Sequence, residues 1–335
     1  MKIAIVGTTT WGTTIGWMLA GRGMEVCLLA RTQEEAARLN RDRENRRLLP
    51  GVAFPRGLSA TASLGSVEAE VAILAVPSQA MRNTVRRIAN EIGEPVLILS
   101  VAKGLEVETT RRMSQVLEEE LAPRLRGRIC VLSGPNLSAE ILRGLPAATV
   151  VASRDLAVAE QAQELLMSPL FRVYTSTDVI GVEFGGSLKN IIALGAGMAD
   201  GLGYGDNAKA ALMTRGLAEI TRLGVAAGAN PLTFAGLAGL GDLVATCSSR
   251  LSRNHQVGEE LARGKSLAEV SASMKNVAEG VPTTVAARRM AREMAVEMPI
   301  TEGVYGVLFE GQDPRRAVEA LMTRQARREL AGIEP

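Results

Sequence analysis

The sequence has few aromatic residues, a single histidine and no excess of either charge. Phe, Trp and Tyr make up 3% of its 335 residues, and 38 Lys and Arg stand against 36 Asp and Glu. Proteins that bind nucleic acids concentrate basic residues on one face, and many add aromatic side chains on which bases stack. No basic block with interleaved aromatics occurs here, so we expect no nucleic acid partner.

Cysteine is also scarce. Cys27, Cys130 and Cys247 are odd in number and lie in apolar runs or beside a serine pair. This pattern indicates free thiols in a reducing compartment and neither a disulfide framework nor a metal site. The chain enters an apolar run directly after Met1 and Lys2, without a signal sequence, and no run of about eighteen uncharged apolar residues predicts a membrane span. We therefore expect a cytoplasmic protein without a metal.

Hydrophobic residues are plentiful, at 47% of the sequence, and their arrangement differs between the two halves. Short apolar runs, typical of strands covered on both faces, occur at residues 3–6, 25–30, 71–76, 96–101, 129–132, 147–153 and 171–176. Four longer helical patterns follow, at residues 182–202, 208–228, 283–298 and 314–329. The sequence predicts an α/β Rossmann-type domain with a parallel sheet over residues 1–180 and an all-helical domain over residues 181–335.

The loop after the first strand has the position of a dinucleotide-binding loop. Residues 7–12 read Gly-Thr-Thr-Thr-Trp-Gly. In such loops glycines allow a tight turn, and backbone N–H groups at a helix N-terminus bind the pyrophosphate. Gly7 and Gly12 fill the first and third glycine positions, whereas Thr9 occupies the second, where its Cβ costs about 1–3 kcal/mol if the backbone is strained. Phosphate contacts of the three threonine hydroxyls can offset part of this cost. The alternative is a turn that serves packing alone.

The end of the second strand carries a cation. Arg31 and Thr32 stand where a carboxylate usually reads the ribose 2′-hydroxyl of NAD. A cation fits the 2′-phosphate of NADP(H), so we expect NADP(H) to be accepted. The alternative is a solvated charge at a strand end.

One lysine lies in an otherwise apolar stretch of small residues. At helical spacing, Phe184, Leu188 and Ile191 form one apolar line, and Lys189 falls on a second face made of glycine, alanine and valine. A buried lysine is costly unless it is paired or has a chemical role. The alternative is a lysine that snorkels to solvent at a domain boundary.

A second polar stretch follows a glycine-rich apolar run. Asp242 comes after residues 237–241, and residues 252–254 are Ser, Arg and Asn. Hydroxyl, guanidinium and amide donors in a row can hold a phosphate. The alternative is a helix cap followed by surface charge. We expect His255, the only histidine, to be structural.

Seven motifs in the same order resemble those of the bacterial NAD(P)-dependent sn-glycerol-3-phosphate dehydrogenases, over nearly the whole chain. They are the loop at residues 7–12 with its tryptophan, and residues 103–106, 133–135, 185–190, 237–243, 252–254 and 277–280. The resemblance implies a Rossmann domain and a helical domain with the active site between them. It implies hydride transfer between NADP(H) or NAD(H) and a phosphorylated small molecule, interconverting dihydroxyacetone phosphate and sn-glycerol 3-phosphate for phospholipid synthesis.

By position, the resemblance implies that Lys189 is the catalytic residue. The implied substrate contacts are Lys103, Gly134, Asn136, Asp242, Ser252, Arg253 and Asn254. The cofactor contacts, including the two loop glycines, are Gly7, Thr10, Trp11, Gly12, Arg31, Lys103, Ser138, Arg253, Val277 and Glu279. Asn136 replaces the more common serine or threonine of the family, and Ser138 replaces its alanine.

In this hypothesis Lys189 transfers a proton to the developing alkoxide, and burial and the nearby Lys103 charge lower its pKa. Lys103 stabilises the charge on the reacting oxygen, and Asp242 orients Lys189 or the substrate hydroxyls. Two alternatives remain: a related two-domain dehydrogenase acting on another phosphorylated or acidic hydroxy compound, and a nucleotide-binding protein without turnover. We also expect a homodimer, paired through the helical domain.

Overall fold

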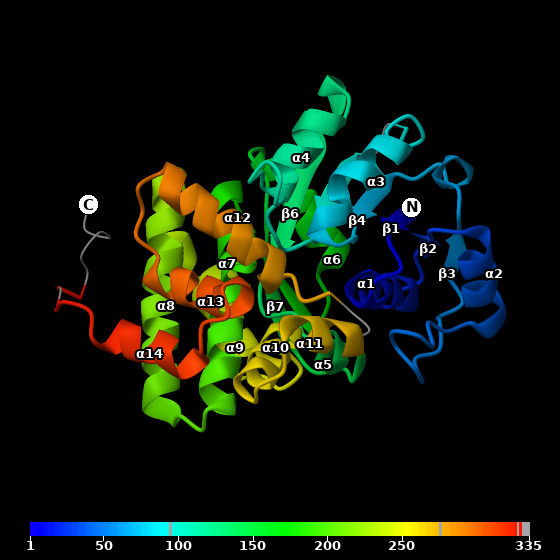
Figure 1. Cartoon of the computed structure of the whole chain (residues 1–335). Coiled ribbons are helices and arrows are strands. Elements are labelled where there is room, and N and C mark those ends of the chain that lie inside the picture. The colour runs from blue at the N-terminus through cyan, green and yellow to red at the C-terminus, as the bar shows by residue number, and fades with distance from the viewer. Residues whose placement is uncertain (94–95, 275–276, 327, 330–335) are drawn as a thin grey trace. The chain divides into compact units, whose positions relative to one another are not determined.

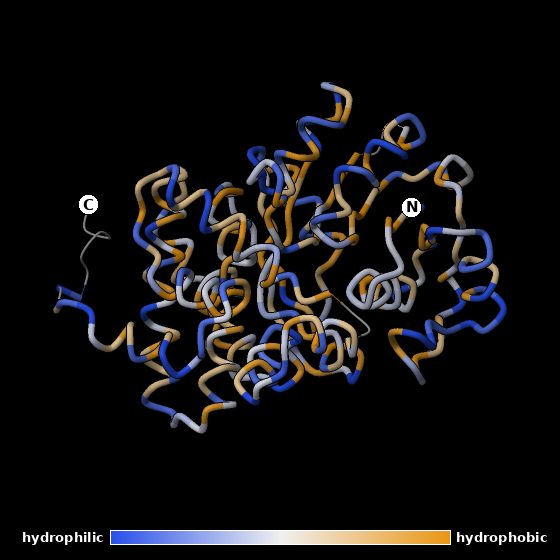
Figure 2. The backbone as a smooth tube through the Cα atoms, in the orientation of Figure 1, coloured by the Kyte–Doolittle hydropathy of each residue, from blue (hydrophilic) through white to orange (hydrophobic). Residues whose placement is uncertain are grey.

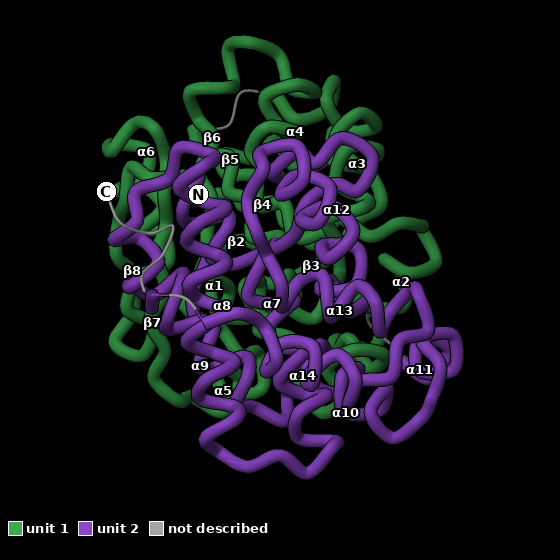
Figure 3. Tube along the Cα trace, turned by 60° about the vertical axis from the view of Figure 1, so that its left-hand side comes forward, with its two compact units in different colours: residues 1–102, 113–132, 136–179 green, residues 103–112, 133–135, 180–335 purple. Residues whose placement is uncertain are grey.

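The computed structural model describes residues 1–93, 96–274, 277–326 and 328–329, and it divides into two compact units (Figures 1 and 3). Unit 1 comprises Met1–Ala102, Met113–Leu132 and Asn136–Val179. Unit 2 comprises Lys103–Arg112, Ser133–Pro135 and Ile180–Pro335. The sequence pattern predicts a single boundary at residue 180; in the structure, two short stretches of the first half also belong to unit 2.

An eight-stranded sheet in the order β3-β2-β1-β4-β5-β6-β7-β8 forms the centre of unit 1. Its strands are β1 (Lys2–Val6), β2 (Glu25–Leu29), β3 (Leu58–Thr61), β4 (Val71–Leu74), β5 (Leu97–Ser100), β6 (Ile129–Ser133), β7 (Ala147–Ala152) and β8 (Phe171–Ser176). Strand β1 pairs in parallel with both β2 and β4, so the strand order reverses at β1. Open α/β sheets bind ligands beyond the carboxyl ends of the strands at such a point.

The Rossmann-type sheet confirms the predicted fold class, although the sequence does not predict β3. This edge strand has alternating buried and exposed residues, so it lacks the continuous apolar run of the central strands. The sheet is flanked by α1 (Thr10–Gly21), α2 (Gln33–Asp42), α3 (Met81–Ile88), α4 (Met113–Glu120), α5 (Ser138–Leu142) and α6 (Leu156–Leu166). Several of these helices carry both hydrophilic and hydrophobic residues (Figure 2).

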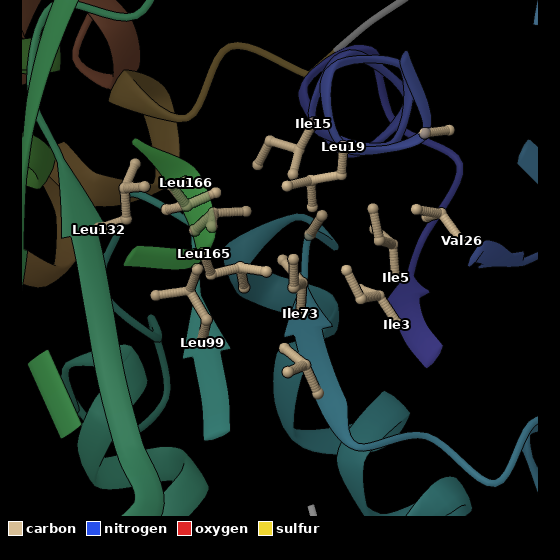
Figure 4. Close-up of a cluster of buried hydrophobic side chains, with 14 of the residues drawn as sticks. Ile3, Ile5, Ile15, Leu19, Val26, Ile73, Leu99, Leu132, Leu165 and Leu166 are labelled. Atoms are coloured by element: carbon tan, nitrogen blue, oxygen red, sulfur yellow. The ribbon is translucent and has the colours of Figure 1, made fainter. Parts of the chain in front are cut away.

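The two faces of the sheet have separate cores because successive side chains of a strand point to opposite sides. Ile3 and Ile5 of β1 belong to a cluster that includes Ile15 of α1 and Leu165 of α6 (Figure 4). The intervening residue Ala4 belongs to the opposite cluster, together with side chains of α3 and α4. The central strands are thus covered on both faces, as their apolar runs predict.

Unit 2 is built from helices around the long helix α7 (Val179–Gly201). The others are α8 (Asp206–Ala226), α9 (Asp242–Ser248), α10 (Arg253–Ala262), α11 (Leu267–Ser273), α12 (Gly280–Glu293), α13 (Pro299–Phe309) and α14 (Pro314–Met322). The predicted helical patterns correspond to α7, α8, α12 and α14, but α14 ends before the predicted residue 329, and residue 327 lies outside the described residues. The sequence does not predict α9, α10, α11 and α13. These helices have 7 to 11 residues, which is too few turns to give a clear helical periodicity.

Helix α7 forms the core of unit 2. By length and composition it is the one helix in the described chain that could cross a membrane, but 89% of its apolar window is buried inside the protein. It packs closely against α10, since a Cβ added to Gly197 would lie 1.9 Å from the His255 carbonyl oxygen. A Cβ added to Gly258 would likewise lie 2.0 Å from the Leu194 carbonyl oxygen. The small-residue face predicted from the sequence therefore lets two backbones meet.

Candidate active site

The loop between β1 and α1 has the tight geometry of a phosphate-binding turn. Gly7 has a φ of +112°, which L side chains rarely adopt, and an added Cβ would lie 3.0 Å from the Ala75 carbonyl oxygen. A Cβ on Gly12 would lie 2.6 Å from the Gly7 carbonyl oxygen. Both glycines are therefore required by the turn itself.

Thr9, which replaces the second glycine of the loop, is not strained. Its φ is −64° with an extended ψ of 166°, and its hydroxyl oxygen caps α1 by accepting from Gly12 N at 3.1 Å. The same hydroxyl donates to the Ala75 carbonyl oxygen at 2.7 Å. The strain considered for this position is absent, because a glycine conformation is not needed there.

The loop threonines do not act alike, which corrects the expectation that all three hydroxyls can donate to phosphate. Thr8 is buried and donates to Glu35 Oε1 at 2.8 Å, and Thr9 donates to a carbonyl oxygen. By contrast, Thr10 Oγ1 and Trp11 Nε1 are buried and have no hydrogen-bond partner among the described residues. Two orphaned polar atoms at the start of α1, beside a glycine turn, fit a bound dinucleotide phosphate group.

Arg31 follows β2 with its side chain exposed. Its backbone N–H donates to Glu35 Oε2 at 3.2 Å, and its Nε lies 3.9 Å from the same oxygen. Thr32 caps α2 by accepting from Glu35 N. The guanidinium thus stays accessible at the strand end where a ribose 2′-substituent is recognised in this fold.

A cluster of charged groups lies in the interior of unit 2. Lys189 Nζ donates to Asp242 Oδ1 at 2.6 Å and to Thr246 Oγ1 at 2.5 Å. Lys103 Nζ donates to Asp242 Oδ2 at 2.7 Å and to the Gly134 carbonyl oxygen at 2.8 Å. Asp242 is 1% exposed and Lys189 6% exposed, so one buried carboxylate bridges two ammonium groups.

Small residues allow this cluster to form. Asp242 begins α9 directly after a π-helical turn, Leu237–Gly241, a feature frequent at functional sites. A Cβ on Gly185 of α7 would lie 2.5 Å from the Ala238 carbonyl oxygen, so glycine lets this turn approach α7. The apolar glycine-rich run before Asp242 therefore brings the carboxylate to Lys189.

Burial lowers the pKa of Lys189 from its usual 10.5 to about 8. The negative charge of Asp242 opposes this shift in pKa, and the positive charge of Lys103 adds to it. A lysine whose pKa lies near neutral pH can exchange a proton with a reactant under working conditions.

The polar stretch after α9 is linked to the cluster through two asparagines. Asn254 Nδ2 donates to Asn190 Oδ1 at 2.9 Å, and Asn254 Oδ1 accepts from Gly280 N at 2.9 Å. Arg253, on the surface at the start of α10, donates from Nη1 to the Val277 carbonyl oxygen at 3.1 Å. Hence the Lys189–Asn190 and Arg253–Asn254 dipeptides are joined, and the latter also binds Val277 and the first residue of α12, Gly280.

The remaining predicted residues have more local roles. Ser252 is buried and caps α10, its Oγ accepting from His255 N at 3.3 Å. Asn136 donates from Nδ2 to Thr149 Oγ1 at 3.0 Å, while its buried Oδ1 has no partner among the described residues. Ser138 is half-buried at the start of α5. His255 is 3% exposed and contacts Asp200 at 2.8 Å, in agreement with a structural role.

Each unit gathers its own share of the predicted site residues. Unit 1 contains Gly7, Thr10, Trp11, Gly12, Arg31, Asn136 and Ser138; unit 2 contains Lys103, Gly134, Lys189, Asp242, Ser252, Arg253, Asn254, Val277 and Glu279. The sequence motifs assign no role to Thr246 or Asn190, although Asn190 ends the motif at residues 185–190. Thr246 lies one helical turn after Asp242, so the spacing of four residues is a signal that could have found it.

Known proteins are similar to this chain over nearly its whole length. Residues 2–159 match the family model for the NAD-dependent glycerol-3-phosphate dehydrogenase N-terminus, and residues 178–319 match the model for its C-terminus. A glycerol-3-phosphate dehydrogenase [NAD(P)+] of Dehalococcoides mccartyi is 55% identical over 99% of this chain and 93% of that protein. One from Pelotomaculum thermopropionicum is 50% identical over 99% of this chain and 96% of that protein.

A solved structure is similar as well. The crystal structure of glycerol-3-phosphate dehydrogenase from Coxiella burnetii is 36% identical, with a TM-score of 0.91 over 96% of this chain and 98% of that one. The glycine loop, the buried lysine–aspartate–lysine cluster and these full-length matches lead to one conclusion: the chain belongs to the NAD-dependent glycerol-3-phosphate dehydrogenase family.

Proposed function

We propose that this protein interconverts dihydroxyacetone phosphate and sn-glycerol 3-phosphate by hydride transfer with NAD(P)H, and thereby supplies glycerol phosphate for phospholipid synthesis. The observation that carries the proposal is the buried cluster in which Asp242 is shared by Lys103 and Lys189. With all three groups charged, two positive charges and one negative leave a single positive charge. Such a site favours an anionic substrate and the negative charge that develops on its carbonyl oxygen.

Lys189 is the proposed proton donor. Its ammonium group donates to Asp242 and Thr246, which leaves one N–H for the substrate oxygen. In the reductive direction a proton moves from Nζ to the developing alkoxide, and in the oxidative direction the neutral amine accepts it. Since its pKa is about 8, both forms are present near neutral pH.

Lys103 and Asp242 prepare the site for this step. Lys103 retains one N–H beyond its bonds to Asp242 and the Gly134 carbonyl, and it is proposed to stabilise the reacting oxygen. Asp242 holds both ammonium groups through separate oxygens, which keeps two like charges close together. A fixed arrangement of this kind lowers the barrier because no reorganisation is needed at the moment of reaction.

Arg253 is the proposed phosphate ligand. Its guanidinium has five N–H groups, of which the structure assigns one to the Val277 carbonyl. The residue begins the ten-residue helix α10, whose N-terminus adds a partial positive charge. Asn254 is buried and engaged with Asn190 and Gly280, so its second Nδ2 hydrogen is the one proposed to reach the substrate.

Unit 1 is proposed to bind the cofactor and unit 2 to bind the substrate and carry out proton transfer. When bound, NAD(P)H supplies the hydride. The proposed cofactor contacts are the unit 1 residues Gly7, Thr10, Trp11, Gly12, Arg31 and Ser138, together with Lys103, Arg253, Val277 and Glu279 of unit 2. The orphaned polar atoms of Thr10 and Trp11 support this assignment, and the accessible Arg31 supports acceptance of NADPH.

We further propose a cytoplasmic homodimer. The three free cysteines support the reducing compartment. Large apolar side chains on the surface of unit 2, such as Phe309 at 42% and Met322 at 81% exposure, support pairing through the helical unit. Light scattering on the purified protein over a range of concentrations would give the mass of the assembly, and a monomer at all concentrations would refute the pairing.

The function is tested by following the absorbance of NADPH, and separately of NADH, with purified protein and dihydroxyacetone phosphate. We expect turnover with both cofactors and formation of sn-glycerol 3-phosphate. Folded protein that binds cofactor but turns over neither would refute the proposal. Turnover restricted to other phosphorylated or acidic hydroxy compounds in a parallel panel would instead identify a related dehydrogenase.

A further inference from the structure

We propose that the buried ion pair between Arg112 and Glu183 fixes the position of Lys103 against Lys189, so that both members of the pair are positioning residues for the reaction. The inference rests on the proposed function, since it assigns the pair a role in the geometry of that site. Neither residue was singled out by the sequence motifs or belongs to the cluster itself.

Lys103 enters unit 2 on a short segment, residues 103–112, that leaves the sheet after β5 and returns to α4. The segment closes on itself: Leu105 and Arg112 form an antiparallel bridge, and Glu106 N donates to the Arg111 carbonyl oxygen at 2.9 Å. Because its two ends are bridged, a contact made at Arg112 also constrains the backbone near Lys103.

Contacts of different kinds hold this segment within unit 2, in addition to those of Lys103 itself. Leu105 is 0% exposed and belongs to the apolar core. Arg289 of α12 donates to the Val107 carbonyl oxygen at the surface. Arg112 Nη1 donates to Glu183 Oε2, with the two side chains only 8% and 6% exposed. An apolar contact tolerates sliding, whereas a buried, charge-assisted hydrogen bond has a defined direction.

Glu183 lies on α7, the same helix that carries Lys189. The ion pair therefore connects the segment that bears Lys103 to the helix that bears Lys189. The two ammonium groups donate to different oxygens of Asp242, Lys103 at 2.7 Å and Lys189 at 2.6 Å. A shift of the segment would lengthen the first of these contacts and leave the second in place.

This arrangement has a chemical consequence that a purely structural ion pair would lack. The positive charge of Lys103 helps burial to lower the pKa of Lys189. If the ion pair is lost and Lys103 moves away, this contribution weakens and the pKa of Lys189 rises. The oxidation of glycerol 3-phosphate requires the neutral amine, so its pH profile should move to higher pH.

The test compares wild-type protein with Glu183→Gln and with the double variant Arg112→Met plus Glu183→Leu. The single variant removes one charge and leaves Arg112 buried with an incomplete partner; the double variant replaces the pair by apolar groups, which protein interiors often tolerate. We expect both folded variants to lose about 10- to 100-fold in kcat, the effect of a small misplacement of a catalytic group. Both should also shift the oxidative pH profile upward.

Glu302→Gln is the matched control. Glu302 accepts from Arg288 at 2.7 Å between α13 and α12 of the same unit, so the variant breaks an ion pair of unit 2 that includes neither α7 nor residues 103–112. Loss of stability without any change in kcat or pH profile is expected there. A wild-type pH profile and kcat in the folded double variant would overturn the proposal.

A second readout separates this inference from the proposed function. The pH dependence of amine labelling at Lys189, followed by peptide mass spectrometry, reports the titration of that lysine without any turnover. If the wild-type protein were inactive, the proposed function would fail, yet an upward shift of this titration in both variants would still support the positioning role. An unchanged titration in both variants would refute it.

Discussion

The two units differ in where they place ionisable side chains. Among the described residues, Glu35 is the one buried charged side chain of unit 1. Unit 2 buries Glu106, Arg112, Glu183, Lys189, Glu219, Asp242 and the imidazole of His255. Both units have extensive apolar cores, so the difference does not reflect a weaker core in unit 2.

Under the proposed function, this difference corresponds to two kinds of recognition. The loop of unit 1 presents backbone N–H groups and small polar side chains on a turn shaped by Gly7 and Gly12, which suits the proposed ligand, a dinucleotide whose phosphates are always charged. Proton transfer requires a side chain that changes its own charge, and burial is the means by which a lysine pKa is moved toward neutrality. In this proposal, burying the ionisable groups that transfer the proton costs desolvation energy in unit 2 and not in unit 1.

Replacement of Lys189 by alanine is the most severe test of this contrast. Without the amine, kcat should fall by about 10²- to 10⁴-fold because general acid–base catalysis is lost. The dissociation constant for NADH, which in the proposed function depends mainly on the loop of unit 1, should stay near the wild-type value. Lys265→Ala, at an exposed lysine of unit 2, is the control. Near-normal turnover with an unchanged pH profile would remove Lys189 from the mechanism.

Asp242→Asn sharpens the comparison by changing one charge inside unit 2. The negative charge of Asp242 holds the pKa of Lys189 up, so its removal should bring that pKa below about 8. The pH profile for glycerol 3-phosphate oxidation should move to lower pH, and kcat should fall by roughly tenfold to 100-fold as the lysines lose their shared anchor. A profile that moves upward would contradict the assigned electrostatics.

Gly197→Ala tests how closely α7 and α10 pack in unit 2, the unit with the charged interior. The new Cβ would lie 1.9 Å from the His255 carbonyl oxygen, so α7 and α10 must separate. We expect a loss of about 3 kcal/mol in the free energy of unfolding, measured with urea. Gly21→Ala in α1 is the control, because nothing lies within 4 Å of its Cβ; it should be neutral or slightly stabilising.

Glu219→Gln tests the energetic cost of a buried acid away from the site. Glu219 accepts from Ile300 N at 2.6 Å and from Thr301 N at 3.2 Å, and burial raises its pKa from 4.5 to about 7. A raised folded-state pKa stabilises the protein at low pH, and this contribution is lost as pH rises through about 7. Because the two pKa values are 4.5 and about 7, the total loss in the free energy of unfolding is about 3 kcal/mol.

The stability of wild-type protein relative to Glu219→Gln should therefore fall by about 2 kcal/mol between pH 5 and pH 7.5. Urea unfolding of both proteins at the two pH values measures the difference. Parallel pH dependence of the two proteins would show that Glu219 does not titrate in this range.

Thr9→Gly should have the smallest effect and tests unit 1. Restoring the second glycine of the fingerprint removes the cap of α1 and the bond to the Ala75 carbonyl, at a cost of about 1 kcal/mol in stability. Because Thr9 is already unstrained at a φ of −64°, the affinity for NADH should change by less than about threefold. Much tighter binding would show that the threonine Cβ obstructs the phosphates.

The central strands and the long helices could be predicted from the sequence because continuous burial leaves a continuous apolar run. The edge strand β3 was missed since only alternate residues are buried, and α9, α10, α11 and α13 were missed because the pattern of a short helix is difficult to distinguish from a loop. The family motifs pointed to Lys103, Lys189 and Asp242, which the structure brings together.

Other features of the site depend on tertiary contacts that spacing does not encode. Nothing in the glycine fingerprint indicates that the Thr9 hydroxyl would cap the helix and also bind the Ala75 carbonyl oxygen, which lies 66 positions further along the chain. The ion pair between Arg112 and Glu183, 71 positions apart, is likewise not indicated by any sequence pattern. Long-range contacts of this kind arise only when the elements pack.

The chain passes between the two units at five peptide junctions: 102/103, 112/113, 132/133, 135/136 and 179/180. This interleaving limits how the protein can be recombined. A gene fragment that ends at the last junction carries Lys103 and Gly134 with the sheet and separates them from Lys189 and Asp242. Exchange of either half between homologues would therefore replace part of the lysine–aspartate cluster as well, so the cluster is inherited intact only with the whole chain.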